Sequence, residues 1–152
     1  MEVIENQYIS VKNVLSYLTR VGSKSLGDLI CHIHRSAEVL DLKVEGKIMF
    51  SVIGTHSIPE DTAMDIEVLV PVDKAFASTS KYVYKPEFKL ENALSIRHYG
   101  RYVDLMKTHK LLNDYLTEKK LKAITNTYFV IDKNSDNNNI VSLYVGISGN
   151  IL

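Results

Sequence analysis

The chain has 152 residues, with 18 basic and 18 acidic side chains and a formal net charge of zero. This length fits one domain, and the charge balance lacks the basic excess of a dedicated nucleic-acid binder. No apolar run approaches the roughly 18 residues that span a bilayer, and a lone cysteine, Cys31, excludes an internal disulfide. Because no secretory leader is visible either, we expect a cytoplasmic protein with no direct nucleic-acid or membrane partner.

The first half of the chain predicts a strand, a helix and two further strands. Residues 9–21 are rich in β-branched and aromatic types, which predicts a strand that ends at Gly22. Apolar residues then recur at helical spacing and predict an amphipathic helix. They are Leu26, Leu29, Ile30, Ile33, Ala37 and Leu40. Residues 47–54 and 64–72 predict the two strands that follow.

The same order of elements returns after a polar connection at residues 73–91. Residues 92–99 predict a strand that Gly100 ends, and residues 126–132 and 140–147 predict the last two strands. A second helical stripe lies between them. It comprises Tyr102, Leu105, Met106, His109, Leu112 and Leu116.

The two halves match element by element, which indicates an internal repeat. The matching anchors are Gly22 with Gly100, Phe50 with Phe129, and Glu67 with Ser142, at offsets of 78, 79 and 75 residues. We therefore predict one α+β domain over residues 1–152, made of two pseudo-symmetric strand–helix–strand–strand repeats at about 8–72 and 92–148. The repeats would form an antiparallel sheet with both helices on one face and a cleft on the other.

The period of two in a strand sorts the side chains of this sheet into two faces. In the strand 64–72 every second residue is apolar and belongs to the helix-covered face, which leaves Glu67 and Leu69 on the other. In the strand 140–147 the same parity leaves Ser142 and Tyr144 opposite the core. We expect these four residues to line the uncovered face, with Tyr144 near Glu67, as in a concave small-molecule site.

Two segments carry a resemblance to a known family. DIEVLVPVDK resembles the Glu-x-x-Ile/Val-Pro strand of the gyrase-inhibitor-like (GyrI-like) effector-binding domains of the SOUL superfamily, and SIRHYGRYVDL is similar to their strand–Gly–Tyr–helix entry. The resemblance covers roughly residues 8–148. Members of that family bind small molecules, often lipophilic cations, in a cleft lined by a buried glutamate and aromatic rings. Many are the sensing part of transcription regulators, and some related proteins are hydrolases.

The resemblance implies a role for particular positions of this chain. Glu67 matches the glutamate of the strand motif, and Tyr102 matches the tyrosine of the helix entry. The chain departs from the family at Ser142, where members often carry the pocket glutamate, and at Arg101, where proline is common. The first departure puts the preference for a cation in doubt.

We therefore expect a stand-alone domain that binds a small amphipathic or cationic molecule. The expected ligand-binding residues are Glu67, Leu69, Tyr99, Tyr102, Tyr128, Ser142 and Tyr144. The alternative is a protein-binding module that uses the open face or the flank at residues 82–88. A hydrolase is the third and least favoured function, because Glu67 has no evident acid–base partner. Whichever holds, a monomer or loose dimer is expected.

No catalytic residue, cofactor or metal site is expected. His32 and His34 look like a metal-binding pair, but they lie two residues apart on a predicted helix. Side chains at that spacing point to different sides of a helix, whereas ligand pairs need a spacing of three or four residues. The identity of the ligand cannot be predicted from the sequence.

Overall fold

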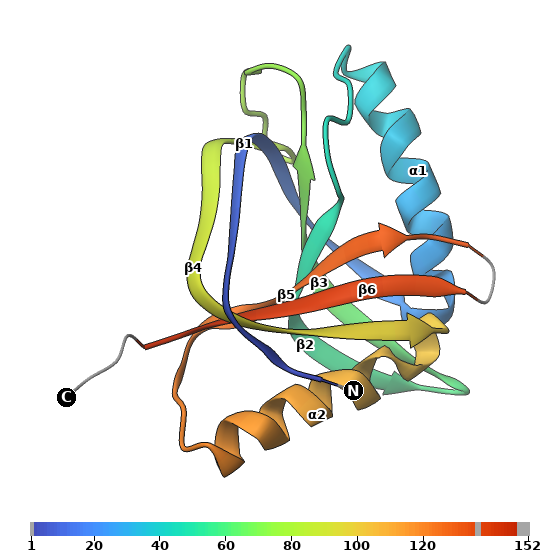
Figure 1. Ribbon diagram of the computed structural model, residues 1–152. Coiled ribbons are helices and arrows are strands. Elements are labelled where there is room, and N and C mark those ends of the chain that lie inside the picture. The colour runs from blue at the N-terminus through green and yellow to red at the C-terminus, as the bar shows by residue number, and fades with distance from the viewer. Residues whose placement is uncertain (1, 136–137, 149–152) are drawn as a thin grey trace.

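The computed structural model describes residues 2–135 and 138–148 (Figure 1). Its elements, in chain order, are β1 (Ile4–Gly22), α1 (Leu26–Val39), β2 (Met49–Ile58), β3 (Asp61–Pro71), β4 (Val83–Gly100), α2 (Leu105–Glu118), β5 (Ala123–Lys133) and β6 (Asn139–Ile147). A short 3₁₀ turn leads into each helix, at Ser23–Ser25 and Tyr102–Asp104. The two predicted strand–helix–strand–strand repeats are thus confirmed. Neither helix is long and apolar enough to cross a membrane, as far as the described residues go.

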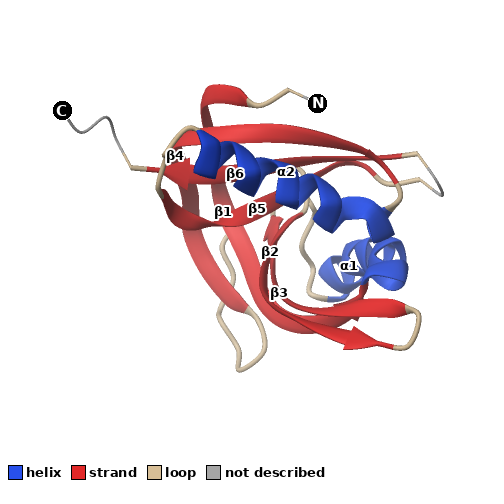
Figure 2. Cartoon of the chain, turned by 90° about the horizontal axis from the view of Figure 1, so that it is seen from below, coloured by secondary structure: helices blue, strands red, loops and turns tan. Residues whose placement is uncertain are grey.

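The six strands form a closed barrel in the order β1-β3-β2-β5-β6-β4, and every neighbouring pair is antiparallel. Each repeat contributes three strands, and the two repeats join along two seams, β1 with β4 and β2 with β5. Figure 2 shows the two helices approaching each other at the ends where they begin. The second seam carries the stacked rings of Phe50 and Phe129, with centroids 4.9 Å apart.

The two longest strands change partners halfway along. The first part of β1 pairs with β4 and its second part with β3, whereas β4 pairs first with β1 and then with β6. Each strand bends where it changes partner (Figure 1). At the two bends Asn13 and Asn92 have φ angles of 55° and 49°, in the left-handed region that asparagine tolerates better than most residues. Because of these bends, one strand pairs with two different neighbouring strands along its length.

The predicted connection at residues 73–91 is too long, because β4 begins at Val83. Residues 85–90 alternate charged side chains with proline or apolar ones, a pattern that a strand exposed on one face produces. Their overall polarity and Pro86 favoured a connection in the sequence. The residues from 83 onward instead form the seam with β1 and lie over the helix-free face of the sheet.

The repeat holds at a constant offset of 79 residues from β1 through β2, with one shift at the last hairpin. Leu26 and Leu105 begin the two α-helices, and Asn13 and Asn92 mark the two bends. The structural counterpart of Gly22 is Arg101, because both cap a 3₁₀ turn with extended backbone. The pairing of Gly22 with Gly100 was therefore one residue out of register.

The core is divided between the two faces of the sheet. Alternate residues of β3 and β6 pack with both helices in one large cluster, which confirms the predicted parity. A smaller cluster occupies the helix-free face, built on Val14, Met49, Leu69 and Val130. Phe88, Tyr128 and Tyr144 pack against this smaller cluster from the side. The helix-free face is therefore filled at its centre and hollowed on either side.

Candidate ligand-binding site

The sheet places Glu67 in a row of side chains that crosses four strands. Strand pairing runs from Glu67 of β3 to Ser51 of β2, then to Tyr128 of β5 and to Tyr144 of β6. Strands β2 and β5 thus lie between the strand of Glu67 and the strand of Tyr144. Burial, and then the charge of Glu67, raise the pKa of Tyr128. Tyr128 is thus the tyrosine of this row whose pKa responds to Glu67, whereas Tyr144, the tyrosine predicted near Glu67, lies on the strand beyond it.

The carboxylate of Glu67 is already paired within the chain. Lys85 Nζ and Ser16 Oγ each donate to Glu67 Oε2 at 2.8 Å. Burial opposes ionisation, but the hydrogen bonds from Lys85 and Ser16 outweigh it, so the pKa of Glu67 lies below its usual value. The side chain of Glu67 is 24% exposed and that of Lys85 is 38% exposed. Glu67 is therefore a half-buried anion held by a lysine that solvent can reach.

A groove of about 540 Å³ opens beside this ion pair. Its lining residues are Ser16, Tyr17, Leu18, Glu67, Ser80, Lys81, Val83 and Lys85. Tyr17 meets Tyr82 edge to face, with centroids 5.4 Å apart. Burial, and then Tyr82, raise the pKa of Tyr17 to about 12, so this ring stays neutral. We call this hollow the first groove.

One lysine of the chain, Lys85, occupies the position in the first groove that a bound cation would take. Lys85 lies on the carboxylate of Glu67. Lys81 Nζ lies over the rings of Tyr17 and Tyr82, at 5.9 and 5.2 Å from their centroids. Carboxylates and aromatic faces are the two groups that attract organic cations most strongly in proteins. Tyr17 pairs with Val68 in the sheet, and its ring packs with Tyr82 against the helix-side core. Within the groove, the group that attracts a cation is therefore the carboxylate of Glu67, where Lys85 takes the place of a ligand.

A second, smaller groove of about 270 Å³ lies on the other side of the central apolar cluster. Its lining residues are Glu2, Ile4, Gln7, Ser95, Ile96, Arg97, Tyr99, Ser142 and Tyr144. The two grooves share no lining residue. The single cleft expected from the sequence is therefore two separate hollows, because Phe88 and its neighbours fill the space between the repeats.

The residues predicted to form one site are distributed over several environments. Glu67 lines the first groove, and Tyr99, Ser142 and Tyr144 line the second. Tyr128 and the fully buried Leu69 belong to the apolar cluster between them. Tyr102 lies apart from all of these, because its ring is buried in the helix-side core and its hydroxyl donates to Asn134 Oδ1 at 2.7 Å. Its position in the 3₁₀ turn directs it away from the helix-free face.

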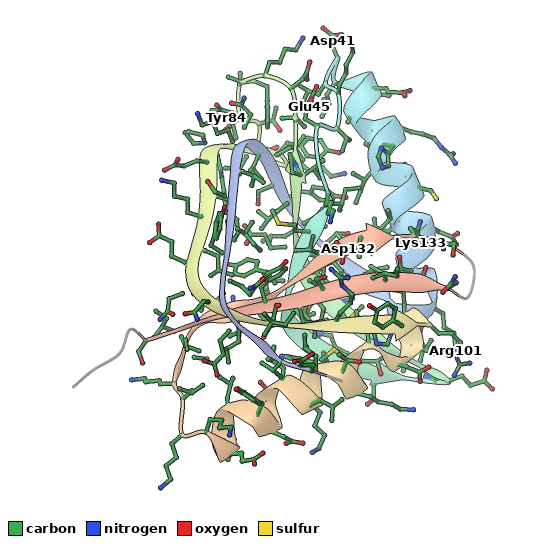
Figure 3. All side chains as sticks on the ribbon, in the orientation of Figure 1. Asp41, Glu45, Tyr84, Arg101, Asp132 and Lys133 are labelled. Carbon is green, nitrogen blue, oxygen red and sulfur yellow. The ribbon has the colours of Figure 1, made fainter. Side chains whose placement is uncertain are left out.

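Sequence reasoning missed the charged partners of the predicted residues. Lys81 and Lys85 fell within the supposed connection, although the alternation of residues 85–90 could have revealed a strand. Asp132 of β5 accepts a hydrogen bond from Ser142 Oγ and pairs with Lys47 Nζ at 2.7 Å. Figure 3 shows Asp132 beside β6. The carboxylate that β6 lacks at Ser142 is thus supplied by the adjacent strand, which only the strand register reveals.

Comparisons with solved structures place this fold beside known ones. The C-terminal domain of EcmrR superposes with a TM-score of 0.65 at 12% sequence identity, over 97% of this chain and 99% of that domain. EcmrR in a complex with DNA gives a TM-score of 0.66 at 12% identity, over 96% of this chain and 57% of that chain. A hydrolase from Listeria innocua gives 0.51 at 10% identity, over 97% and 90% of the two chains.

In comparisons of sequence alone, no protein-family model and no curated protein matched the chain. At these low identities, the structural likeness concerns the fold and not the ligand or the reaction. The chain has the fold of the EcmrR C-terminal domain, which confirms the fold predicted from its resemblance to GyrI-like domains.

Proposed function

We propose that this chain binds a small amphipathic molecule with a cationic group in the first groove. The observation that supports the proposal is the Glu67–Lys85 pair, a half-buried carboxylate whose partner is a solvent-accessible lysine at the wall of a groove of about 540 Å³. The cationic group would replace Lys85 on Glu67. The apolar part would lie along the exposed side chains of Leu18 and Val83.

The replacement of Lys85 is energetically feasible. Ion pairs between partly exposed side chains contribute only about 0.2–1 kcal/mol, so displacing Lys85 costs little. A ligand that also buries apolar surface gains more than this, at about 25 cal/mol for each Å² removed from water. Charge alone is therefore not enough for tight binding, and the ligand has to be amphipathic.

The state of Glu67 supports binding rather than hydrolysis. An effective general base has a pKa near the working pH, so that it both accepts a proton readily and is free to do so. The hydrogen bonds from Lys85 and Ser16 hold the pKa of Glu67 below its usual value, which makes it a weak base. A carboxylate of this kind serves better as a fixed negative charge.

The test is a nuclear magnetic resonance titration with three single-ring probes of different charge. Benzyltrimethylammonium is the cation, benzyl alcohol the neutral probe and benzoate the anion. We expect the cation to shift the amide signals of residues around Tyr17 and Lys85, and to bind about tenfold more weakly to Glu67→Gln, since it loses a charge-assisted contact. The affinity for benzyl alcohol should change little between wild type and Glu67→Gln. Equal affinity of the cation for wild type and Glu67→Gln would contradict the proposal.

A further inference from the structure

The second groove is the counterpart of the first under the internal repeat, but it carries charged side chains at different positions. Strand pairing sets Leu18 beside Glu67 in the first repeat and Arg97 beside Ser142 in the second. The second groove therefore has a cation where the first has an apolar side chain. It has a hydroxyl where the first has a carboxylate. One scaffold thus carries two sites of different chemistry.

Arg97 is held by its Nε atom. Nε donates to Ser142 Oγ at 3.4 Å, and Ser142 Oγ in turn donates to Asp132 Oδ2. The closest approach of Arg97 to Asp132 is also through Nε, at 3.9 Å, whereas Lys47 Nζ lies 2.7 Å from the same carboxylate. Lys47 is thus the closer counter-charge of Asp132. A side-chain hydrogen bond with Tyr99, and then the charge of Asp132, raise the pKa of Arg97. Within residues 2–135 and 138–148, no acidic side chain other than Asp132 pairs with Arg97, so its guanidinium can still take an anionic partner.

The walls around Arg97 combine aromatic rings with small buried hydroxyls. Tyr99 is 57% exposed and Tyr144 is half-buried, and both line the groove with Arg97. Ser95 and Ser142 are buried at its floor, 6% and 4% exposed. A guanidinium presents a planar pair of donors that matches a carboxylate, and tyrosine rings pack well against another ring. The volume of about 270 Å³ is half that of the first groove and suits a single-ring molecule.

We propose that the second groove binds a small aromatic carboxylate. Arg97 would grip the carboxylate through its terminal amino groups, and Tyr99 and Tyr144 would pack against the ring. Among the described residues of the lining, Glu2 is the one acidic side chain, and it is exposed. Its charge opposes an anionic ligand, so its removal should strengthen binding. This inference goes beyond the proposed function, because it concerns another groove and a ligand of opposite charge.

The experiment is a titration of the whole chain with benzoate, followed by amide chemical shifts, with benzyl alcohol as the neutral comparison. Benzoate should bind more tightly than benzyl alcohol and shift the signals of residues near Arg97 and Tyr144. Arg97→Gln should weaken benzoate binding by about tenfold or more, since charge-assisted paired hydrogen bonds are lost. Arg97→Lys keeps the charge without the planar pair of donors, so an intermediate loss is expected, and it decides the matter should the glutamine variant fail to fold. Glu2→Gln should tighten binding.

The matched control is Arg20→Gln, because Arg20 pairs with Asp65 and lines neither groove. Its affinity for benzoate should equal that of wild type. Glu67→Gln should also leave benzoate binding unchanged, which separates this inference from the fate of the first groove. The inference is overturned if benzoate binds no more tightly than benzyl alcohol, if Arg97→Gln or Arg97→Lys binds it as well as wild type, or if the shifts map to another surface.

Discussion

Phe50 of β2 and Phe129 of β5 stack face to face across the seam between the repeats, with ring planes only 3° from parallel. They are equivalent residues at the offset of 79 and pair directly in the sheet, so the pseudo-two-fold axis passes between them. Both rings are buried, at 2% and 0% exposure. His109 of α2 meets Phe129 edge to face, with centroids 5.5 Å apart. The contact thus joins both repeats and one helix at the centre of the core.

Replacing either ring should destabilise the whole domain. We expect Phe129→Ala and Phe50→Ala each to lower the free energy of unfolding by about 3–5 kcal/mol, the usual cost of deleting a buried aromatic ring. The double variant should lose less than the sum, because the two residues touch. Urea unfolding monitored by circular dichroism measures both effects. Tyr8→Ala is the control, since Tyr8 is 74% exposed, and its stability should stay within about 0.5 kcal/mol of wild type.

The bends of β1 and β4 should depend on the residue that occupies the left-handed conformation. Asn13→Val and Asn92→Val should each destabilise the domain by about 1–2 kcal/mol, because valine is strained at positive φ. Asn13→Gly removes the backbone strain but also the hydrogen bond from Tyr84 Oη to Asn13 Oδ1, so a smaller loss is expected. Thermal unfolding of the three variants checks this order. If Asn13→Val were as stable as Asn13→Gly, the strand ladders alone would set the bend.

Stability should fall in mildly acidic solution because of His109. Burial lowers the pKa of His109, whose Nε2 lies 3.0 Å from Thr127 Oγ1. In the pH range between its folded and unfolded pKa values, the unfolded chain binds more protons, so stability rises with pH there. Wild type should therefore lose more stability than His109→Asn as the pH falls from about 7 to 5. The exposed His34, replaced by Asn and measured over the same pH range, is the control for the substitution itself.

The sequence predicted the repeat, the order of elements and the two faces of the strands at 64–72 and 140–147, because these depend on local periodicity. The parity that directs Ile66 and Val68 to the helices and Glu67 away from them needs only the strand period of two. What surrounds Glu67 depends on strand register and on bends, which are not local. Lys85 reaches Glu67 from a strand that begins 16 residues later in the chain.

Position in a repeat also proved a weaker guide than register for the aromatic residues. Tyr144 shares a row with Glu67, but strands β2 and β5 lie between them. Tyr102 follows Gly100 closely, yet the 3₁₀ turn directs its ring into the helix-side core. Aligning Gly22 with Gly100 instead of Arg101 shifts the repeat by one residue, which conceals that the two 3₁₀ turns are equivalent.

In the proposed function, Lys85 occupies a cation site in the first groove. Removing that lysine tests this role most directly. The dissociation constant of benzyltrimethylammonium should be measured for wild type, Lys85→Met and Lys89→Met. Lys89 lies on the same strand and pairs with Glu87 at 3.9 Å, so it serves as the matched control. Lys85→Met frees Glu67 and should tighten binding about threefold, in line with the worth of a partly exposed ion pair, while Lys89→Met should match wild type. Unchanged or weaker binding by Lys85→Met would contradict the claim.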